Sequence, residues 1–289
     1  MQDTKVSIVI PAKNEAAGLE KLLPSLEERY PGYQLILVDD GSEDGTGAMT
    51  ESLEKAITIH HPYSMGNGAA IKAGARASES EYIVFMDADG QHRAEDVEKL
   101  IRELDAGYDM AVGARSRDSH ASTARLLANT FYNVFASFIV GRRIYDLTSG
   151  LRAVRASCFK EILHLLPNGF SYPTTSTMAF FRSGYSVTYV PIKAEKRIGK
   201  SHIKLFRDGV RFLMILFKIG TLYSPLKIFL PVSGMIFTTG IGYYMYTYIT
   251  AGRFTNMSAL LFTTAMTIFL MGLVSEQITS LIYMQNKRD

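Results

Sequence analysis

The sequence Asp87-Ala88-Asp89-Gly90-Gln91-His92, which directly follows the apolar run at residues 82–86, indicates the fold class of this chain. The run is short and continuously hydrophobic, which is typical of a strand buried on both faces of a parallel sheet. Two carboxylates one residue apart then stand where that strand must end. Ligands of open α/β sheets bind at the carboxyl ends of strands, and carboxylate oxygens suit Mg²⁺ or Mn²⁺. The stretch therefore predicts a metal-assisted site, with an acidic turn capping the next helix as the alternative.

Strand and helix signals alternate through the first 120 residues. The predicted strands are residues 6–10, 34–38, 56–59, 82–86 and 110–112. Helical patterns fall between them, at about 15–29, 44–55, 68–78 and 94–106. This alternation predicts an α/β domain built on a doubly wound, mostly parallel sheet.

Composition narrows the class of protein further. The chain has 289 residues, enough for one sizeable α/β domain and a smaller part. Its net charge of +3 is too small to indicate a nucleic-acid-binding protein. The single cysteine, Cys158, excludes an internal disulfide and is expected to be a small buried side chain. No signal-peptide pattern precedes the first strand, so we expect the N-terminal domain to be cytosolic.

Two stretches near the C-terminus contain no charged residue, namely 228–252 and 254–275. A bilayer core requires about 20 apolar residues per helix, so both stretches are predicted to span a membrane as a hairpin, at about 228–250 and 255–277. Lys218 and Lys227 precede the first span and Lys287 and Arg288 follow the second. The positive-inside rule places both chain ends in the cytoplasm. Two buried helices of a soluble protein are the alternative.

Residues 203–219 have the pattern of an amphipathic helix. Lys204, Arg207, Asp208, Arg211 and Lys218 fall within an arc of about 100° on a helical wheel. A mostly basic stripe opposite a wide apolar face predicts a helix lying in the membrane interface, and a soluble core helix is the alternative. Residues 126–141 are uncharged but too short to span, so they form either a core helix or a membrane-facing helix.

Polar groups follow three of the predicted strands. The first strand ends in Pro11-Ala12-Lys13-Asn14-Glu15 and the second in Asp39-Asp40-Gly41-Ser42. A further loop, residues 64–72, opens a helix with small residues, which lets backbone approach a ligand. Because strand ends of a parallel sheet converge, we expect these groups to share one site with Asp87 and Asp89.

Four of these segments together resemble family 2 glycosyltransferases of GT-A fold. They are Val9-Ile10-Pro11-Ala12-Lys13-Asn14-Glu15, Val38-Asp39-Asp40-Gly41-Ser42-Glu43-Asp44-Gly45-Thr46, Gly66-Asn67-Gly68-Ala69-Ala70 and Asp87-Ala88-Asp89-Gly90-Gln91. The resemblance covers roughly residues 5–200 and is strongest to polyprenyl-phosphate glycosyltransferases, which include dolichyl-phosphate mannose synthases. Residues 146–152 and 197–202 are similar to motifs of that group. Lys13, where many relatives have an aromatic residue, and His202, where a lysine is commoner, depart from the pattern.

The resemblance implies an inverting, metal-dependent transfer of sugar from a UDP- or GDP-sugar to a polyprenyl monophosphate. Mg²⁺ or Mn²⁺ would be bound by Asp87, Asp89 and Gln91. The implied catalytic residues are Asp89, Asp146, Arg115, Arg125 and Arg197. The implied nucleotide-sugar-binding residues are Pro11, Lys13, Glu15, Val38, Asp40, Lys72, Asp87, Ala88, Gln91 and Ser201.

Asp146 has two interpretations, because a lipid monophosphate is already an anionic nucleophile. It acts as a base or orienting carboxylate, or it caps the turn at Thr148 and Ser149.

The predicted organisation is a GT-A domain at 1–202, an interfacial helix at 203–226 and two membrane helices at 227–289. Catalysis is placed at the cytoplasmic face of the cell membrane, where membrane lipids are partners and assembly into homo-oligomers is left open. Two other functions compete with this one: an inactive membrane scaffold that binds nucleotide sugar or supports a flippase, and a polysaccharide synthase. The chain has no Trp, whereas processive members of the family carry a Gln-x-x-Arg-Trp motif.

Overall fold

The structure is a computed structural model, and it describes residues 5–51, 53, 55–115, 123–169, 172–193, 217 and 220–285. At 123–129 and 283–285 it describes the backbone. The chain divides into two compact units. The first comprises Met1–Phe138 and Arg142–Ile203, and the second Ile139–Gly141 and Lys204–Asp289.

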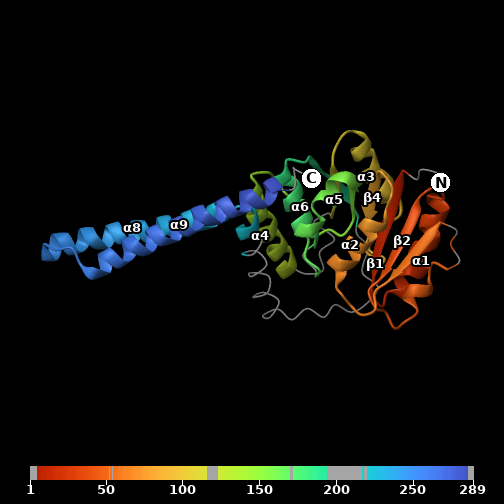
Figure 1. Ribbon diagram of the computed structural model, residues 1–289, viewed down its shortest axis with the longest axis horizontal. Helices are drawn as coiled ribbons and strands as arrows, with labels where there is room; N and C mark the ends of the chain where they lie inside the picture. Colours follow the sequence, from red (N-terminus) through yellow and green to blue (C-terminus); the bar gives the residue numbers. More distant parts are fainter. Residues whose placement is uncertain are drawn as a thin grey trace. The chain divides into compact units, whose positions relative to one another are not determined.

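The first unit is built on a seven-stranded sheet of order β3-β2-β1-β4-β6-β5-β7. Strands β1, β2 and β4 of this sheet are labelled in Figure 1. Neighbouring strands are parallel except at β6, which is antiparallel to both β4 and β5. The strands are β1 (Val6–Ala12), β2 (Gln34–Asp39), β3 (Ala56–His60), β4 (Tyr82–Phe85), β5 (Met110–Arg115), β6 (Arg152–Arg155) and β7 (Val187–Ile192).

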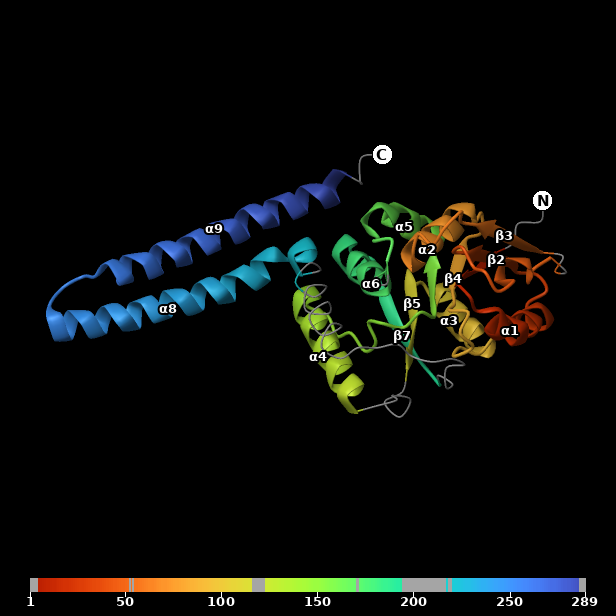
Figure 2. The ribbon, with the colours of Figure 1, turned by 90° about the horizontal axis from the view of Figure 1, so that it is seen from below.

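Helices cover both faces of this sheet (Figure 2). Helices α1 (Ala16–Arg29) and α3 (Glu95–Asp105) lie on one face. Helices α2 (Asn67–Ala77), α5 (Ala156–Glu161) and α6 (Tyr172–Ser183) lie on the other. The described residues of this unit also form most of α4 (Thr123–Val140) and the short 3₁₀ helices η1 (Thr46–Ala48) and η3 (Leu163–Leu165).

Alternation along the strands explains why both faces are covered, because successive side chains point to opposite faces. Ile8 and Ile10 belong to the core that contains Leu19 and Leu26 of α1. Phe85 packs on the opposite side, where its ring lies 4.6 Å from that of Phe159 in α5. The continuous apolar runs of the sequence are therefore strands buried on both faces.

The pairing register brings the polar strand ends to one edge of the sheet. Pro11 of β1 pairs with Val38 of β2, and Val9 pairs with Phe85 of β4. Because β6 runs in the opposite direction and begins where β4 ends, the segment that precedes it, 146–151, also reaches this edge. The ends of β1, β2 and β4 and the segment before β6 therefore meet at the carboxyl edge of the sheet.

The five predicted strands and three of the four predicted helices are confirmed. The helix predicted at 44–55 is wrong, since the described residues there contain the 3₁₀ helix η1 and turns. Glycine at 45 and 47 is the physical reason: each glycine in a helix costs about 1 kcal/mol relative to alanine, and Gly45 has a φ of 86°. Strands β6 and β7 were not predicted.

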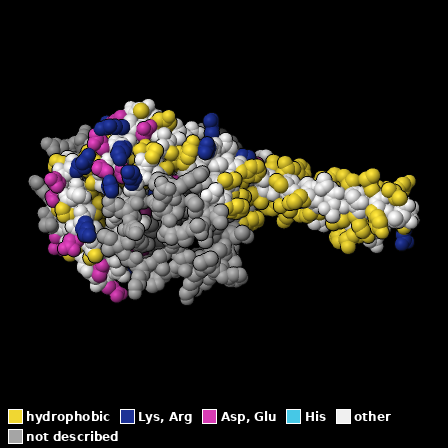
Figure 3. Space-filling model, turned by 180° about the vertical axis from the view of Figure 1, so that it is seen from behind, with side chains coloured by type: hydrophobic (Ala, Val, Ile, Leu, Met, Phe, Trp, Pro, Cys, Tyr) yellow, Lys and Arg dark blue, Asp and Glu magenta, His cyan; other side chains and the backbone are white. Residues whose placement is uncertain are grey.

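The second unit contains a hairpin of two long apolar helices, α8 (Pro225–Ala251) and α9 (Asn256–Gln285). Both are long and apolar enough to cross a membrane, and few of their residues are buried. On the side seen in Figure 3 the hairpin surface is mainly hydrophobic, which suggests a membrane hairpin. Ser233 of α8 donates a hydrogen bond to the carbonyl oxygen of Ala265 in α9, at 2.8 Å. The amphipathic helix predicted at 203–219 lies outside the described residues, apart from Phe217.

Candidate active site

The loops that follow β1 and β2 are bonded to each other. Asn14, in the first loop, has a left-handed backbone conformation with a φ of 54°. Asparagine tolerates this conformation better than most residues do. Four hydrogen bonds join the loops: Asn14 N to Ser42 Oγ (3.0 Å), Glu43 N to Asn14 Oδ1 (2.9 Å), Glu15 N to Thr46 Oγ1 (3.1 Å) and Ala16 N to Asp44 Oδ2 (3.1 Å). The predicted convergence of these strand ends is confirmed.

Asp40 ties the end of β2 to the loop that precedes α2. Its Oδ1 accepts hydrogen bonds from His61 Nδ1 (2.7 Å) and Met65 N (2.8 Å). Its Oδ2 accepts from Ser64 Oγ (2.8 Å) and Gly66 N (2.9 Å). Burial alone would raise the pKa of Asp40, but these four bonds outweigh it and the pKa lies below its ordinary value. Since a carboxylate offers about four lone-pair sites, Asp40 holds this loop with all of them. Its predicted contact with the donor stays a prediction.

The small residues at the start of α2 make room for the protein's own chain. A Cβ at Gly68 would lie 2.0 Å from the carbonyl oxygen of Pro167, and one at Gly66 would lie 2.4 Å from that of Asn168. Lys72 of α2 donates to the same segment, at 3.1 Å to the Leu166 carbonyl and 2.5 Å to Asn168 Oδ1. The close approach expected toward a ligand is therefore made to residues 166–168.

Four other residues predicted to bind the nucleotide sugar lie along the same edge. Pro11 and Val38 are paired strand residues with buried side chains, and Val38 packs toward Gly74 of α2. Lys13 is exposed. Ala88 is buried, and its carbonyl oxygen faces Gly18 of α1. Their contact with a donor stays a prediction.

Asp87 and Asp89 stand at the end of β4 with different exposure. The Asp87 side chain is 34% exposed, whereas Asp89 is almost buried. Asp89 Oδ1 accepts a hydrogen bond from Gln91 N at 3.2 Å. His92 Nε2 lies 3.9 Å from Asp87 Oδ2, and burial lowers the pKa of His92 to about 4. The imidazole is therefore neutral at neutral pH.

This donor set fits Mg²⁺ or Mn²⁺. Two carboxylates one residue apart supply hard oxygen ligands, and such ions normally complete their shell with water and substrate phosphates. No group of three or more His, Cys, Asp or Glu side chains suited to a metal occurs among the described residues. The edge therefore resembles an open site, in which a ligand completes the shell, more than a closed protein cage.

Arg115 and Asp146 form a largely buried ion pair beside these carboxylates. Arg115 Nε lies 2.8 Å from Asp146 Oδ2, and its Nη2 lies 3.0 Å from Oδ1. Asp146 Oδ1 also accepts a hydrogen bond from Thr148 N at 3.1 Å. Burial alone would raise the pKa of Asp146, but the bonds from Arg115 keep it below its ordinary value. Asp146 thus orients Arg115 and caps the turn at Thr148, and its low pKa disfavours a role as a base.

Three residues at this edge have contacts to which sequence reasoning gave no role. They are His92, Gly150, which packs against Asp87, and the fully buried Arg152. The signal available in the sequence was the run Thr148-Ser149-Gly150-Leu151-Arg152, where a glycine and an arginine stand beside apolar residues. The side chain of Arg125, together with Arg197 and Ser201, lies outside the described residues.

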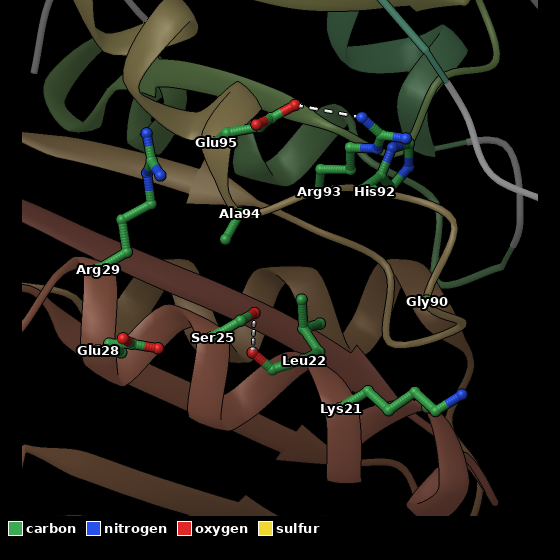
Figure 4. A pocket seen from close by; sticks show the side chains of 11 residues that line it. Lys21, Leu22, Ser25, Glu28, Arg29, Gly90, His92, Arg93, Ala94 and Glu95 are labelled. Carbon is green, nitrogen blue, oxygen red and sulfur yellow. Dashed lines mark hydrogen bonds and ion pairs between the residues drawn. The ribbon is translucent and has the colours of Figure 1, made fainter.

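A separate cavity of about 660 Å³ lies between α1 and the start of α3 (Figure 4). Gly90 and His92 line it on one side, and Lys21 and Arg29 line it on the other. Neither Asp87 nor Asp89 lines it. It is therefore distinct from the edge that carries these two carboxylates.

Comparison with known proteins agrees with this geometry. The pattern of Glycosyl transferase family 2 matches residues 7–163, more than half of the chain. The chain belongs to glycosyltransferase family 2. A second pattern, the GtrB C-terminal hairpin, matches residues 224–281, which include most of α8 and α9.

Similar proteins include several lipid-phosphate sugar transferases. The chain is 32% identical to polyprenol monophosphomannose synthase of Mycolicibacterium smegmatis, over 72% of this chain and 83% of that protein. It is 30% identical to undecaprenyl-phosphate mannosyltransferase of Micrococcus luteus, over 68% and 86%. Among solved structures, glucosyl-3-phosphoglycerate synthase of Mycobacterium tuberculosis in complex with Mn²⁺, UDP-glucose and phosphoglyceric acid has a TM-score of 0.61 at 19% identity, over 75% and 80%. That likeness confirms the GT-A fold.

Proposed function

We propose that this glycosyltransferase transfers a sugar from a UDP- or GDP-sugar to a polyprenyl monophosphate, with inversion and with the help of a divalent metal ion. One observation carries the proposal. The same chain holds a GT-A sheet edge with Asp87, Asp89 and Arg115 and a hairpin of two exposed apolar helices. The relatives named for lipid-phosphate sugar transfer support it.

The residues at the ends of β4 and β5 are suited to stabilise a departing nucleoside diphosphate. Asp87 and Asp89, with Gln91, would hold Mg²⁺ or Mn²⁺, which when bound neutralises charge on the diphosphate. Arg115 remains charged and, oriented by Asp146, supplies a fixed cation beside that position. Because a phosphomonoester acceptor is already anionic, the chain needs to position it and needs no strong base.

Helix α4 gives the first unit an apolar surface of its own. Phe131, Val134 and Phe138 are exposed and recur at a spacing that places them on one stripe. Tyr132 and Ala136 of the same helix are buried. The buried face agrees with the core interpretation of residues 126–141, and the exposed face is the one available to a membrane. In the proposed function this stripe contacts the membrane that contains the acceptor, on the cytoplasmic side.

We further propose the organisation expected from the sequence: a catalytic domain at 1–202, an interfacial region at 203–226 that carries Lys204, Arg207, Arg211 and Lys218, and a membrane hairpin at 227–289. The donor-binding roles of Lys13, Glu15, Lys72 and Ser201, and the phosphate-binding roles of Arg125 and Arg197, belong to the same proposal.

The decisive experiment supplies purified full-length protein with labelled UDP- and GDP-sugars and with undecaprenyl or dolichyl phosphate. We expect lipid-linked product with the monophosphate, none with the free polyprenol, and loss of product in excess chelator. NMR of the product should show inversion at the anomeric carbon. A soluble sugar accepted equally well would contradict the proposed acceptor. Binding of nucleotide sugar without transfer to any acceptor would instead support an inactive scaffold.

A further inference from the structure

Gly150 lies directly against the carboxylate of Asp87. A Cβ built at Gly150 would lie 1.9 Å from Asp87 Oδ2, 2.4 Å from Cγ and 2.7 Å from Oδ1. All three distances are shorter than real Cβ contacts. Gly150 is not among the residues with positive φ, so its backbone conformation is open to other residues. What position 150 requires is the absence of a side chain.

Hydrogen bonds hold the backbone at Gly150 and on either side of it. Arg152 Nη2 donates a hydrogen bond to the Ser149 carbonyl at 2.5 Å, and Tyr172 Oη donates to the Gly150 carbonyl at 3.4 Å. Gly113 N of β5 donates to the Leu151 carbonyl at 2.9 Å. The segment is therefore bonded on both sides of Gly150.

Arg152 connects this backbone segment to the start of α6 in the interior. Its side chain is fully buried, and its Nη1 donates to the start of α6 through the Pro173 carbonyl (2.7 Å), Ser176 Oγ (2.7 Å) and Thr177 Oγ1 (3.1 Å). Removing a buried charged donor leaves these acceptors unsatisfied, which is costly. Moving the backbone at 149–151 would break these hydrogen bonds. A side chain at position 150 would therefore displace the Asp87 carboxylate instead.

We infer that Gly150 and Arg152 are positioning residues of the donor site: Arg152 fixes the Ser149–Gly150 peptide, and the side-chain-free surface of Gly150 sets the orientation of the Asp87 carboxylate. This inference rests on the proposed role of Asp87 as a metal ligand. Both residues act through Asp87 and not by touching substrate.

The test measures Mn²⁺ binding to full-length protein in detergent by electron paramagnetic resonance, together with thermal unfolding. Changing the partners that orient metal ligands typically costs 10- to 100-fold in affinity, so Gly150→Ala should weaken Mn²⁺ binding by at least about tenfold. Arg152→Lys keeps the charge but not the fork of donors, so it should shift affinity in the same direction. Gly32→Ala is the matched control, because a Cβ at Gly32 meets nothing within 4 Å, and it should match the wild type.

A double variant tests the steric mechanism independently of any metal. If the added methyl group acts on Asp87, then Gly150→Ala should lower the unfolding temperature less in the Asp87→Ala background than in the wild type. This comparison remains decisive if Gly150→Ala alone fails to fold, or if wild-type protein binds no Mn²⁺, a result that would overturn the metal role in the proposed function. Wild-type Mn²⁺ affinity and unfolding temperature in Gly150→Ala, or an equal fall in unfolding temperature in both backgrounds, would overturn the positioning role.

Discussion

The two halves of the carboxyl edge carry acidic pairs that look alike in sequence and are held in different ways. In the first half, over β3, β2 and β1, Asp40 is buried and accepts four hydrogen bonds from one neighbouring loop. In the second half, over β4, β6 and β5, the Asp87 side chain is one-third exposed and faces Gly150 and His92. Backbone amides, a hydroxyl and an imidazole organise the first half, whereas the charged pair of Arg115 and Asp146 organises the second.

This difference indicates a division of labour. A carboxylate whose lone pairs are all used by the protein stabilises a loop, and replacing it should affect folding first. A carboxylate at a solvent-accessible edge beside an oriented arginine is placed to act on a ligand, and replacing it should affect activity first. Substitutions in the two halves should therefore affect stability and activity to different extents.

The largest expected effect is in the second half. Asp89→Ala removes a carboxylate that we propose binds the metal, and a bound metal contributes several kcal/mol of charge stabilisation to a transition state. We expect transfer to fall by about 1000-fold, equivalent to about 4 kcal/mol. Because Asp89 is buried and accepts a hydrogen bond from Gln91 N, the free energy of unfolding should fall as well, but only by about 1 kcal/mol. Steady-state transfer assays and urea titration of the same preparation measure both quantities.

Near-normal transfer by Asp89→Ala would remove the metal assignment. A large fall in its unfolding midpoint would contradict the claim that the second half affects activity before stability. Asp105→Ala serves as the control: this carboxylate belongs to an exposed pair with Lys5, and exposed pairs contribute about 0–1 kcal/mol.

The second prediction concerns the first half. Asp40→Ala leaves the Met65 and Gly66 amides, His61 and the Ser64 hydroxyl without their acceptor. Each buried donor left unsatisfied costs about 1–3 kcal/mol, reduced where the loop relaxes toward water. We therefore expect the free energy of unfolding to fall by about 3 kcal/mol, measured by urea denaturation. Transfer should fall only as far as the folded fraction does.

If Asp40→Ala instead keeps its unfolding free energy and loses affinity for nucleotide sugar, then Asp40 contacts the donor directly, as the resemblance implies. The two halves would then differ in exposure but not in role. Binding of UDP and GDP by isothermal titration distinguishes these outcomes.

The third prediction probes the ion pair. Arg115→Lys keeps the positive charge but loses the two-pronged contact with Asp146 and the bond from Nη2 to Thr148 Oγ1 at 2.6 Å. Lysine does not replace arginine at such sites. We expect kcat/KM to fall about tenfold and stability to fall by about 1 kcal/mol, the value of one typical hydrogen bond. Arg102→Lys, which affects an exposed pair with Glu98, should change neither; if it changes both equally, the effect of Arg115→Lys is not specific.

Much of this edge was predictable from the sequence, because the strands are apolar runs and their polar ends stand at fixed positions. Asp87 and Asp89 at the end of a buried strand, and Asn14 beside Ser42, follow from convergence of parallel strands. Strand β6 was missed because Arg152-Ala-Val-Arg155 is short and carries two arginines. One of them, Arg152, is buried and donates hydrogen bonds to acceptors in α6. That burial depends on residues far apart in the chain, which periodicity does not report.

The same limit applies to the glycines. Sequence alone indicates that Gly66 and Gly68 permit close approach, but it does not say to what, and the structure places the backbone of residues 167–168 there. The contact of Gly150 with Asp87 is likewise tertiary. Long-range packing, rather than local propensity, separates a glycine that accommodates the chain from one that orients a carboxylate.

The smallest expected effect is the pH dependence of stability in the first half. The pKa of Asp40 lies below its ordinary value of 3.8 because four hydrogen bonds outweigh burial. A carboxyl whose folded-state pKa is depressed contributes stability above the unfolded value and loses it as pH falls through the folded value. The part of the wild type's stability advantage over Asp40→Asn that comes from this ionised carboxyl should therefore be present down to about pH 5. It should shrink below pH 3.8 as the carboxyl is protonated. Urea denaturation across this range measures the difference between the two proteins, and because other shifted carboxyls such as Asp146 are common to both, they cancel. A difference that stays constant through this window would show that the four bonds do not depend on the charge of Asp40, and the contrast between the halves would then rest on exposure alone.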